Sequence, residues 1–211
     1  MILEGAIGYL ADFGFDTSTR DLASHLGISQ SLLFRYFPSK DALIDAVYDV
    51  VFLNRWNDEW EQILRDRGRS LRERLRDFYR DYFRSINRYE VIRISLYSAL
   101  RGESLNDRYM HRVRDRLIHR IVEELRAELG VAGPAEAAIS PFEEDLVFSL
   151  HASVIYTIIR KQVFDLEIAA DVDFMIELYV DGFLASAPQA LRRIAARLDP
   201  AALPRPQDHA P

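Results

Sequence analysis

Apolar residues recur every three to four positions along almost the whole chain, and a sustained alternation of apolar and polar residues is hard to find. This spacing is typical of amphipathic α-helices, whereas half-buried strands show a period of two. The pattern therefore predicts an all-α protein, in which short helices at the N-terminus are followed by longer ones.

Short helices fill the first 37 residues in this prediction, and small or capping residues mark where they end and begin. Gly14 is a plausible C-cap for the first helix. Ser18 and Ser29 can each accept a hydrogen bond from a free backbone N–H group at a helix start. Pro38 cannot continue a helix comfortably, and Ser39 can cap the next one. The first three predicted helices span residues 2–13, 19–26 and 30–36.

A fourth helix should start after Ser39 and extend toward Leu64, which would link the short helices to the rest of the chain. Further predicted helices span residues 71–86, 89–100, 105–129, 142–164, 174–187 and 191–198. Residues 199–211 are proline-rich and are expected to be a disordered tail. The predicted organisation is a first domain over residues 1–48, a second over residues 49–198, and this tail.

The segment from residue 19 to residue 37 has the features of a helix-turn-helix. Ala23 is small where the two helices would cross, and Gly27, four positions later, tolerates the positive φ of a tight turn. Four residues would then point inward, against the first helix: Leu22, Leu26, Leu33 and Phe37. Four others are candidates to face outward: Gln30, Ser31, Phe34 and Arg35. In such a motif the second helix enters the major groove of DNA.

The run "GFDTSTRDLASHLGISQSLLFRYFPSKDALI" resembles the N-terminal domain of TetR-family transcriptional regulators. The "YFPSK" run, the upstream "GF" and the "RDLA" before "GIS" carry this resemblance, which covers roughly residues 2–48. It implies an N-terminal three-helix DNA-binding domain, joined by a linking helix to a C-terminal helical domain for ligand binding and dimerisation. No catalytic or cofactor role is implied.

Seven residues carry over from the resemblance as expected DNA contacts. Thr19, Tyr36 and Lys40 would contact phosphates, with the N-terminus of the fourth helix assisting Lys40. Gln30, Ser31 and Arg35 would approach base edges or flanking phosphates. Phe34 stands where the family usually has tyrosine, so it is either an exposed aromatic at the DNA face or a buried anchor.

The charge of the chain changes this picture in one respect. The net charge is −6, and residues 1–56 carry four cations against seven anions. The chain also begins almost at the first helix, without the basic arm that family members often have. We therefore expect weaker DNA affinity and a shallower salt dependence than in a relative with that arm. The alternative function is a TetR-like dimer that binds a ligand or protein and has lost operator binding.

The segments 142–164 and 174–187 are more apolar than one buried stripe requires. Their apolar positions on more than one face are Val154, Ile155, Ile158, Ile159, Phe174, Leu178 and Phe183. One face can enter the core of the monomer, and the other predicts a homodimer packed as a four-helix bundle, which the resemblance also implies. A dimer would present two reading heads to a pseudo-palindromic operator. The alternative is a larger monomer core.

Aromatic residues with a few polar tips in the middle helices suit a cavity for a small, largely apolar effector. The candidate lining residues are Phe78, Tyr82, Tyr97, Tyr109, Phe148 and His151. The alternative is that these aromatics belong to the core. A bound effector would have to favour one separation of the two heads, and the fourth helix would transmit that choice. The expected function is a ligand-responsive regulator, a repressor that its effector releases from DNA.

Other features exclude or favour further classes of protein. The chain has no nucleophile elbow, no glycine-rich phosphate loop and no zinc-protease motif, so we expect no enzyme, metal or cofactor. Arginines between residues 65 and 88 alternate with acidic residues, which favours a salt-bridged helix face over a basic patch. The absence of cysteine, of a signal peptide and of a long apolar run predicts a cytoplasmic protein.

Overall fold

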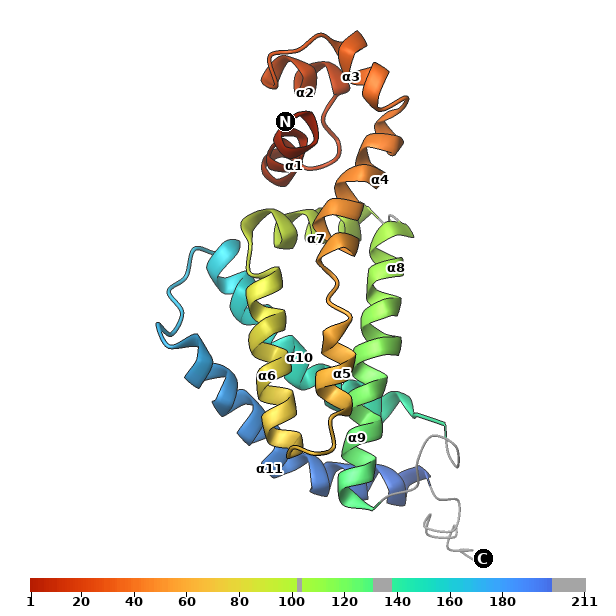
Figure 1. Cartoon of the computed structure of the whole chain (residues 1–211), viewed down its shortest axis with the longest axis vertical. Helices are drawn as coiled ribbons and strands as arrows, with labels where there is room; N and C mark the ends of the chain where they lie inside the picture. The colour runs from red at the N-terminus through yellow and green to blue at the C-terminus, as the bar shows by residue number, and fades with distance from the viewer. Residues whose placement is uncertain (102–103, 131–137, 199–211) are drawn as a thin grey trace, which may run out of the picture.

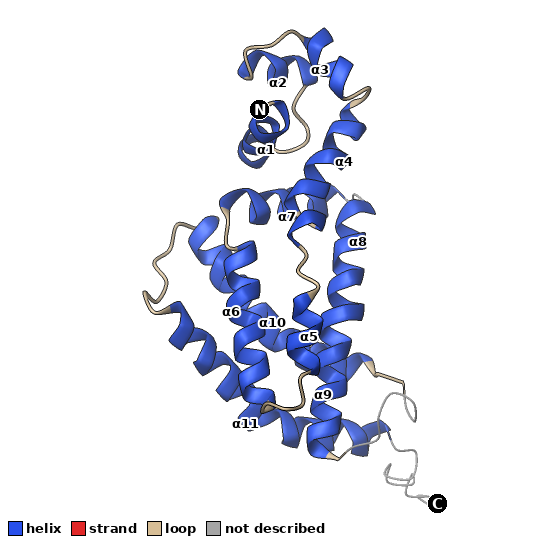
Figure 2. Cartoon of the chain, viewed as in Figure 1, coloured by secondary structure: helices blue, strands red, loops and turns tan. Residues whose placement is uncertain are grey.

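The computed structural model describes residues 1–101, 104–130 and 138–198 (Figure 1). Helices make up most of this part of the chain and no strand occurs in it (Figure 2), so the predicted all-α fold is confirmed. None of its helices is long and apolar enough to cross a membrane. The tail expected at residues 199–211, and most of the loop expected after Gly130, lie outside the described residues.

Three short helices form a head at one end of the molecule (Figure 1): α1 (Ile2–Phe13), α2 (Thr19–His25) and α3 (Gln30–Tyr36). Their starts and ends follow the predicted capping residues. The Ser18 hydroxyl accepts a hydrogen bond from the Asp21 amide at 3.1 Å, and the Ser29 hydroxyl accepts one from the Leu32 amide at 3.2 Å. Gly14 ends α1 with a φ of 73°, which a residue with a Cβ rarely adopts.

Helix α4 (Lys40–Val51) starts at Ser39 as predicted, but it does not extend to Leu64. The chain leaves the helix at Phe52, forms a short 3-10 turn η1 (Leu53–Arg55), and enters a separate helix α5 (Glu59–Arg65). The break turns Trp60 into the core, where its indole N–H donates to Asp81 at 2.6 Å. A straight continuation of α4 was therefore the wrong prediction, because this contact with a distant helix decides the path of the chain.

The helices after α5 form a body below the head (Figure 1): α6 (Leu71–Ile86), α7 (Tyr89–Arg101), α8 (Ser104–Val113), the π-helical turn η2 (Arg114–Ile118), α9 (His119–Leu129), α10 (Pro141–Gln162) and α11 (Val172–Leu198). Helix α7 packs against α1, so it lies between the head and the body. Helix α11 packs against both α10 and α6. The head and the body therefore meet at α4 and α7.

Helix α11 includes the stretch 191–198, for which a separate short helix was predicted. Pro188 lies within α11 and removes one backbone hydrogen bond. Ala187 and Leu191 on either side of the proline are buried, so side-chain packing keeps the helix continuous through it. The predicted break was wrong for this reason.

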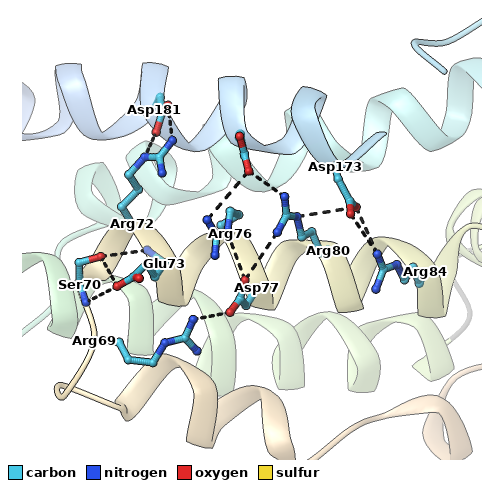
Figure 3. A network of polar contacts seen from close by, with 11 residues as sticks. Arg69, Ser70, Arg72, Glu73, Arg76, Asp77, Arg80, Arg84, Asp173 and Asp181 are labelled. Atoms are coloured by element: carbon cyan, nitrogen blue, oxygen red, sulfur yellow. Dashed lines mark hydrogen bonds and ion pairs between the residues drawn. The ribbon is translucent and has the colours of Figure 1, made fainter. Parts of the chain in front are cut away.

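Several arginines of α6 form ion pairs with acidic residues of α11 (Figure 3). Arg72 donates to Asp181 at 2.5 Å and 2.8 Å, and Arg84 donates to Asp173 at 3.2 Å and 3.3 Å. Asp77 accepts from Arg76 at 3.2 Å. The predicted salt-bridged face is present, but most of its carboxylates come from α11, which lies about a hundred residues later in the chain.

The other acidic residues of the segment from 65 to 88 have different contacts from those expected. Glu73 completes a capping box with Ser70 at the start of α6. Asp66 accepts a hydrogen bond from the Gly68 amide, and Asp81 accepts from Trp60. These carboxylates fix the ends of α6 and the position of α5, and so only part of the acidic spacing reflects pairing with arginine.

Candidate functional site

Helices α2 and α3 cross through a tight turn that has the predicted geometry. Ala23 is buried at the crossing, and its carbonyl accepts a hydrogen bond from the Ile28 amide at 3.0 Å. Gly27 has a φ of 66°, the left-handed conformation that favours glycine. Leu22 and Leu33 are buried as predicted. The sequence therefore folds here into a helix-turn-helix whose second helix lies at the free end of the molecule (Figure 1).

The outward face of α3 is formed by residues that the sequence placed there. Tyr36 is 64% exposed and Phe34 is 39% exposed, so Phe34 is an exposed aromatic and not a buried anchor. Ser31 and Arg35 are also exposed. Within the described residues Arg35 has no hydrogen-bond or ion-pair partner, and the same holds for Arg20 on α2. This face presents an aromatic pair and free positive charge to solvent.

Three other candidates form contacts that tie α2, α3 and α4 together. The Gln30 side-chain amide donates to the Thr19 hydroxyl at 2.8 Å. The Lys40 ammonium donates to the Thr17 carbonyl at 2.6 Å. Each group keeps unused capacity, because a glutamine has a second N–H and a carbonyl, and a lysine has two further N–H groups. The structure therefore brings all seven predicted DNA contacts to one end of the head.

The body contains a cavity of about 260 Å³ between α6, α7, α8, α10 and the end of α4. Four of the six predicted lining residues surround it: Tyr82, Tyr109, Phe148 and His151. Phe52, Ile92, Ser95 and Ile155 also line it and were not predicted. Ile92 and Ser95 lie three positions apart on α7, so the sequence places them on the same face of the helix. This spacing does not tell whether that face lines a cavity or packs in the core.

Two predicted lining residues, Phe78 and Tyr97, lie outside the cavity. Phe78 is fully buried behind Tyr82, with its ring 6.1 Å from that of Trp60. Tyr97 faces α1, and its ring lies 3.2 Å from the position that a Cβ on Gly14 would take. The prediction that these two residues line the cavity was wrong. Phe78 packs in the core against Trp60, and Tyr97 packs against the end of α1.

Polar groups in the cavity wall are few, and only some of them have partners. The hydroxyls of Tyr82 and Tyr109 lie 3.2 Å apart and pair with each other. His151 is 5% exposed, and its Nδ1 has no hydrogen-bond partner among the described residues. Burial lowers the pKa of His151 to about 4, so the imidazole is neutral at pH 7. Within the described residues, the wall therefore offers two polar side chains without a hydrogen bond, the deeply buried His151 imidazole and the Ser95 hydroxyl.

Helix α7 contacts the head on one side and the cavity on the other. The Arg93 guanidinium donates to the Ala11 carbonyl at 2.6 Å, near the C-terminal end of α1. The Tyr89 hydroxyl donates to the Asp12 carboxylate at 2.8 Å. Val91, Ile92 and Ser95 line the cavity from the same helix. A shift of α7 at the cavity would therefore act directly on α1.

The outer face of α10 and α11 carries exposed apolar and small side chains. Phe174 and Leu178 are each 55% exposed, and Tyr156 is 56% exposed. A shallow groove beside Leu178 is lined by the small residues Ser149, Ser153, Gly182 and Ser186. No other described atom lies within 4 Å of the position that a Cβ on Gly182 would take. Val154, Ile158 and Phe183 are buried in the core, so they form one of the two predicted apolar faces, and Phe174 and Leu178 belong to the other.

The head is similar in sequence to known bacterial regulators. Residues 2–47 match the family described as bacterial regulatory proteins, tetR family. The chain is also 33% identical over 82 residues to tetracycline repressor protein class A from transposon 1721 of Escherichia coli. That alignment covers 35% of this chain and 38% of the repressor, so the chain spans well under half of the curated relative that it matches.

Solved structures extend the likeness to most of the chain. A TetR-like transcriptional regulator from Rhodococcus sp. RHA1 has a TM-score of 0.63 and 22% identity, and 87% of this chain and 93% of that one are covered. The TetR family transcriptional regulator PfmR from Thermus thermophilus has a TM-score of 0.62 and 22% identity, with 87% and 97% covered. This family consists of transcription factors and not of enzymes. The head therefore matches the tetR family of bacterial regulatory proteins over residues 2–47, and the chain shares the fold of these solved regulators.

Proposed function

We propose that the protein is a cytoplasmic repressor that binds a pseudo-palindromic operator as a homodimer and leaves it when a small, largely apolar effector binds. Residues 1–48 would bind DNA, and residues 49–198 would bind the effector and form the dimer. The observation that carries the proposal is the exposed face of α3, where Arg35 and Tyr36 have no role in the packing of the chain. Free positive charge on a reading helix is what a DNA contact requires.

The seven candidate residues divide into two roles in this proposal. Thr19, Tyr36 and Lys40 would contact phosphates and set the position of the head on the duplex. Gln30, Ser31 and Arg35 would reach base edges, since glutamine suits adenine and arginine suits guanine. Phe34, which has no hydroxyl, would make an apolar contact such as one with a thymine methyl group.

A second copy of the chain is the proposed occupant of the outer face of α10 and α11. Exposed apolar side chains and a groove of small residues let two helix pairs approach closely as a four-helix bundle. Gly182→Leu should therefore dissociate the dimer with little effect on the monomer, because a Cβ at this position points into open space. Gly8→Leu is the matched control, since Gly8 on α1 also has open space around it. Sedimentation at several protein concentrations measures the result; an unchanged dimer in Gly182→Leu would contradict this interface.

The effector signal would reach the head through two helices. The expected route through α4 gains support from Phe52, which follows α4 directly and lines the cavity. Helix α7 supplies a second route, since it lines the cavity and holds the end of α1 through Arg93. Arg93→Ala should keep operator binding but weaken the response of that binding to the effector, because it removes the contact with α1. Arg88→Ala is the control, because Arg88 is exposed and its loss should leave the response unchanged.

A mobility-shift assay with DNA that flanks the gene of this protein tests the whole proposal. Salt-sensitive binding to one fragment over others supports the repressor. The acidic balance of residues 1–56 favours the rival function, a dimer that binds a ligand or protein without an operator. Equal or absent binding on every fragment would support that rival and contradict the repressor.

A further inference from the structure

We propose that the cavity takes an uncharged aromatic molecule of one or two rings that carries a hydroxyl group, and that this hydroxyl hydrogen-bonds to His151. The proposal rests on the effector function above and adds the chemical class of the ligand. It depends on three properties of the cavity, which are its apolar wall, its size and the buried histidine that has no hydrogen bond within the described residues.

The wall of the cavity excludes a charged ligand. Its surface is formed by aliphatic side chains such as Val113 and Ile155 and by the rings of Phe52 and Phe148. No Asp, Glu, Lys or Arg side chain lines it within the described residues. A charged group placed there would lose its hydration without gaining an opposite charge. Aromatic walls favour a ligand ring, because rings meet in offset or edge-to-face contacts.

The size of the cavity limits the ligand further. Its volume of about 260 Å³ corresponds to roughly nine water molecules at ~30 Å³ each. That space suits one or two fused rings with a small substituent. Polar groups on such a ligand must be few, because almost every wall atom is apolar and an unpaired polar atom loses its hydrogen bonds to water.

His151 is the deeply buried polar side chain of the wall that has no hydrogen bond within the described residues. Its ring lies 5.1 Å from the ring of Tyr82 and 6.3 Å from that of Phe148, so it is held between two other lining residues. The hydroxyls of Tyr82 and Tyr109 already pair with each other. Nδ1 of His151 has no partner within the described residues, although its side chain is more than nine-tenths buried. Nδ1 has almost no accessible surface, whereas Nε2 of the same ring is accessible and also has no hydrogen bond within the described residues. A ligand that pairs with Nε2 gains affinity.

A hydroxyl group fits this histidine better than other neutral groups. A neutral imidazole has one nitrogen that donates and one that accepts, and which is which depends on the tautomer. A hydroxyl both donates and accepts, so it pairs with the accessible ring nitrogen, Nε2, in either tautomer. A ketone or an ether only accepts, and it would pair with one tautomer alone. A carboxylate would bring a negative charge that no lining residue balances.

Three compounds with the same ring system test the proposal: 2-naphthol, naphthalene and 2-naphthoate. Calorimetric titration of the full chain without DNA should give a dissociation constant for 2-naphthol about five to a hundred times lower than for naphthalene. In His151→Phe, which keeps a ring but removes both nitrogens, this preference should disappear. Tyr97→Phe is the control, because Tyr97 lies outside the cavity and its substitution should leave the preference intact.

Several outcomes would overturn the proposal. They are a preference for 2-naphthol that survives in His151→Phe, tighter binding of 2-naphthoate, and no binding of any of the three by the folded wild type. Tighter binding of 2-naphthoate would point to Arg112, which stacks on Trp56 and does not line the cavity. If His151→Phe does not fold, ¹⁵N spectra of the wild type replace it. The His151 ring nitrogens should then shift with 2-naphthol and not with naphthalene.

The failure of this inference and the failure of the proposed function give different results. If 2-naphthol binds through His151 but leaves operator binding unchanged, the ligand class stands and the regulatory function fails. If 2-naphthol and naphthalene bind equally and both release the operator, the effector function stands and the role of His151 fails.

Discussion

Arginine has opposite surroundings at the two ends of the molecule. On α3, Arg35 is exposed and has no partner within the described residues. On α6, arginines face carboxylates of α11 or α9, as Figure 3 shows for Arg72 and Asp181. The same side chain therefore supplies available charge in the head and neutralised charge in the body. The number of cations in a segment does not reveal which of the two applies.

The arginines of the two regions differ because residues far away in the sequence neutralise those of α6. The arginine-rich segment of α6 is more basic than the head when it is viewed by itself. Its neutralising carboxylates, such as Asp173 and Asp181, come from a helix that starts about 85 residues later. In the head, no such helix covers α3 among the described residues. Unpaired positive charge that can contact DNA is therefore expected at the outer face of α3 and not on α6.

The largest expected effect concerns the buried pair on the body side of this comparison. Arg74 and Glu124 are both buried, and the Arg74 guanidinium donates to the Glu124 carboxylate at 2.7 Å. Glu124→Gln would leave the Arg74 charge unbalanced in the core, which should cost about 3–5 kcal/mol in the free energy of unfolding. Urea unfolding at a fixed protein concentration measures the change. Glu123→Gln, on the same helix but more exposed, is the control and should lose far less.

Acid should weaken the same region by protonating its carboxylates. Burial raises the pKa of Glu124, but hydrogen bonds from Arg67 and Arg74 lower it by more, so the net pKa lies below its ordinary value of 4.5. Because the folded pKa is lower than the unfolded one, the stabilisation is present above about pH 4.5 and is lost as the pH falls through the folded value. Thermal unfolding between pH 3 and pH 7 checks the direction. Glu124→Gln should flatten this pH dependence, and an equal slope in both proteins would assign it to other groups.

On the head side, removing free charge should change DNA binding and leave stability unaltered. Arg35→Ala should weaken binding to the preferred operator by about 1–3 kcal/mol and relax the choice among operator variants. Fluorescence anisotropy at a fixed salt concentration gives both quantities. Arg72→Ala on α6 is the matched control, because its charge is already paired. Equal losses from the two substitutions would remove the distinction between the two regions.

The smallest effect is expected from the exposed pair at the end of the network. The side chains of Arg72 and Asp181 are 45% and 44% exposed, so solvent and salt screen their attraction. Asp181→Asn should leave the unfolding midpoint in urea within experimental error. A clear loss of stability would show that the ion pairs along α6 and α11 act together as one network.

The head was largely predictable because its signals are local. Ser18, Ser29 and Ser39 each act within the next three residues, and the structure places all three at helix starts. Gly27 takes the positive φ that its place in the turn predicted. Such signals need no knowledge of distant contacts, and the exposed positions of α3 follow from them.

The body was less predictable because its features depend on which helix faces meet. Helix α4 ends at Val51, and Trp60 on α5 then donates a hydrogen bond to Asp81 on α6. The sequence around Val51 gives no sign of this distant contact. Tyr82 and Phe78 share one face of α6, yet only Tyr82 lines the cavity. Tyr97 fits beside Gly14, a contact between residues more than eighty positions apart. The helical spacing of aromatic residues thus identifies buried faces, but it does not distinguish core residues from those that line the cavity.

Phe52 lies where the head and the body of the molecule meet. It follows the last residue of α4, its side chain is buried, and it forms part of the cavity wall. A substitution there would alter the fit of an effector and the placement of the head at the same time. If the cavity binds the proposed effector, changes at Ala152 and Ile155 on α10 would alter its specificity and leave the end of α4 unchanged.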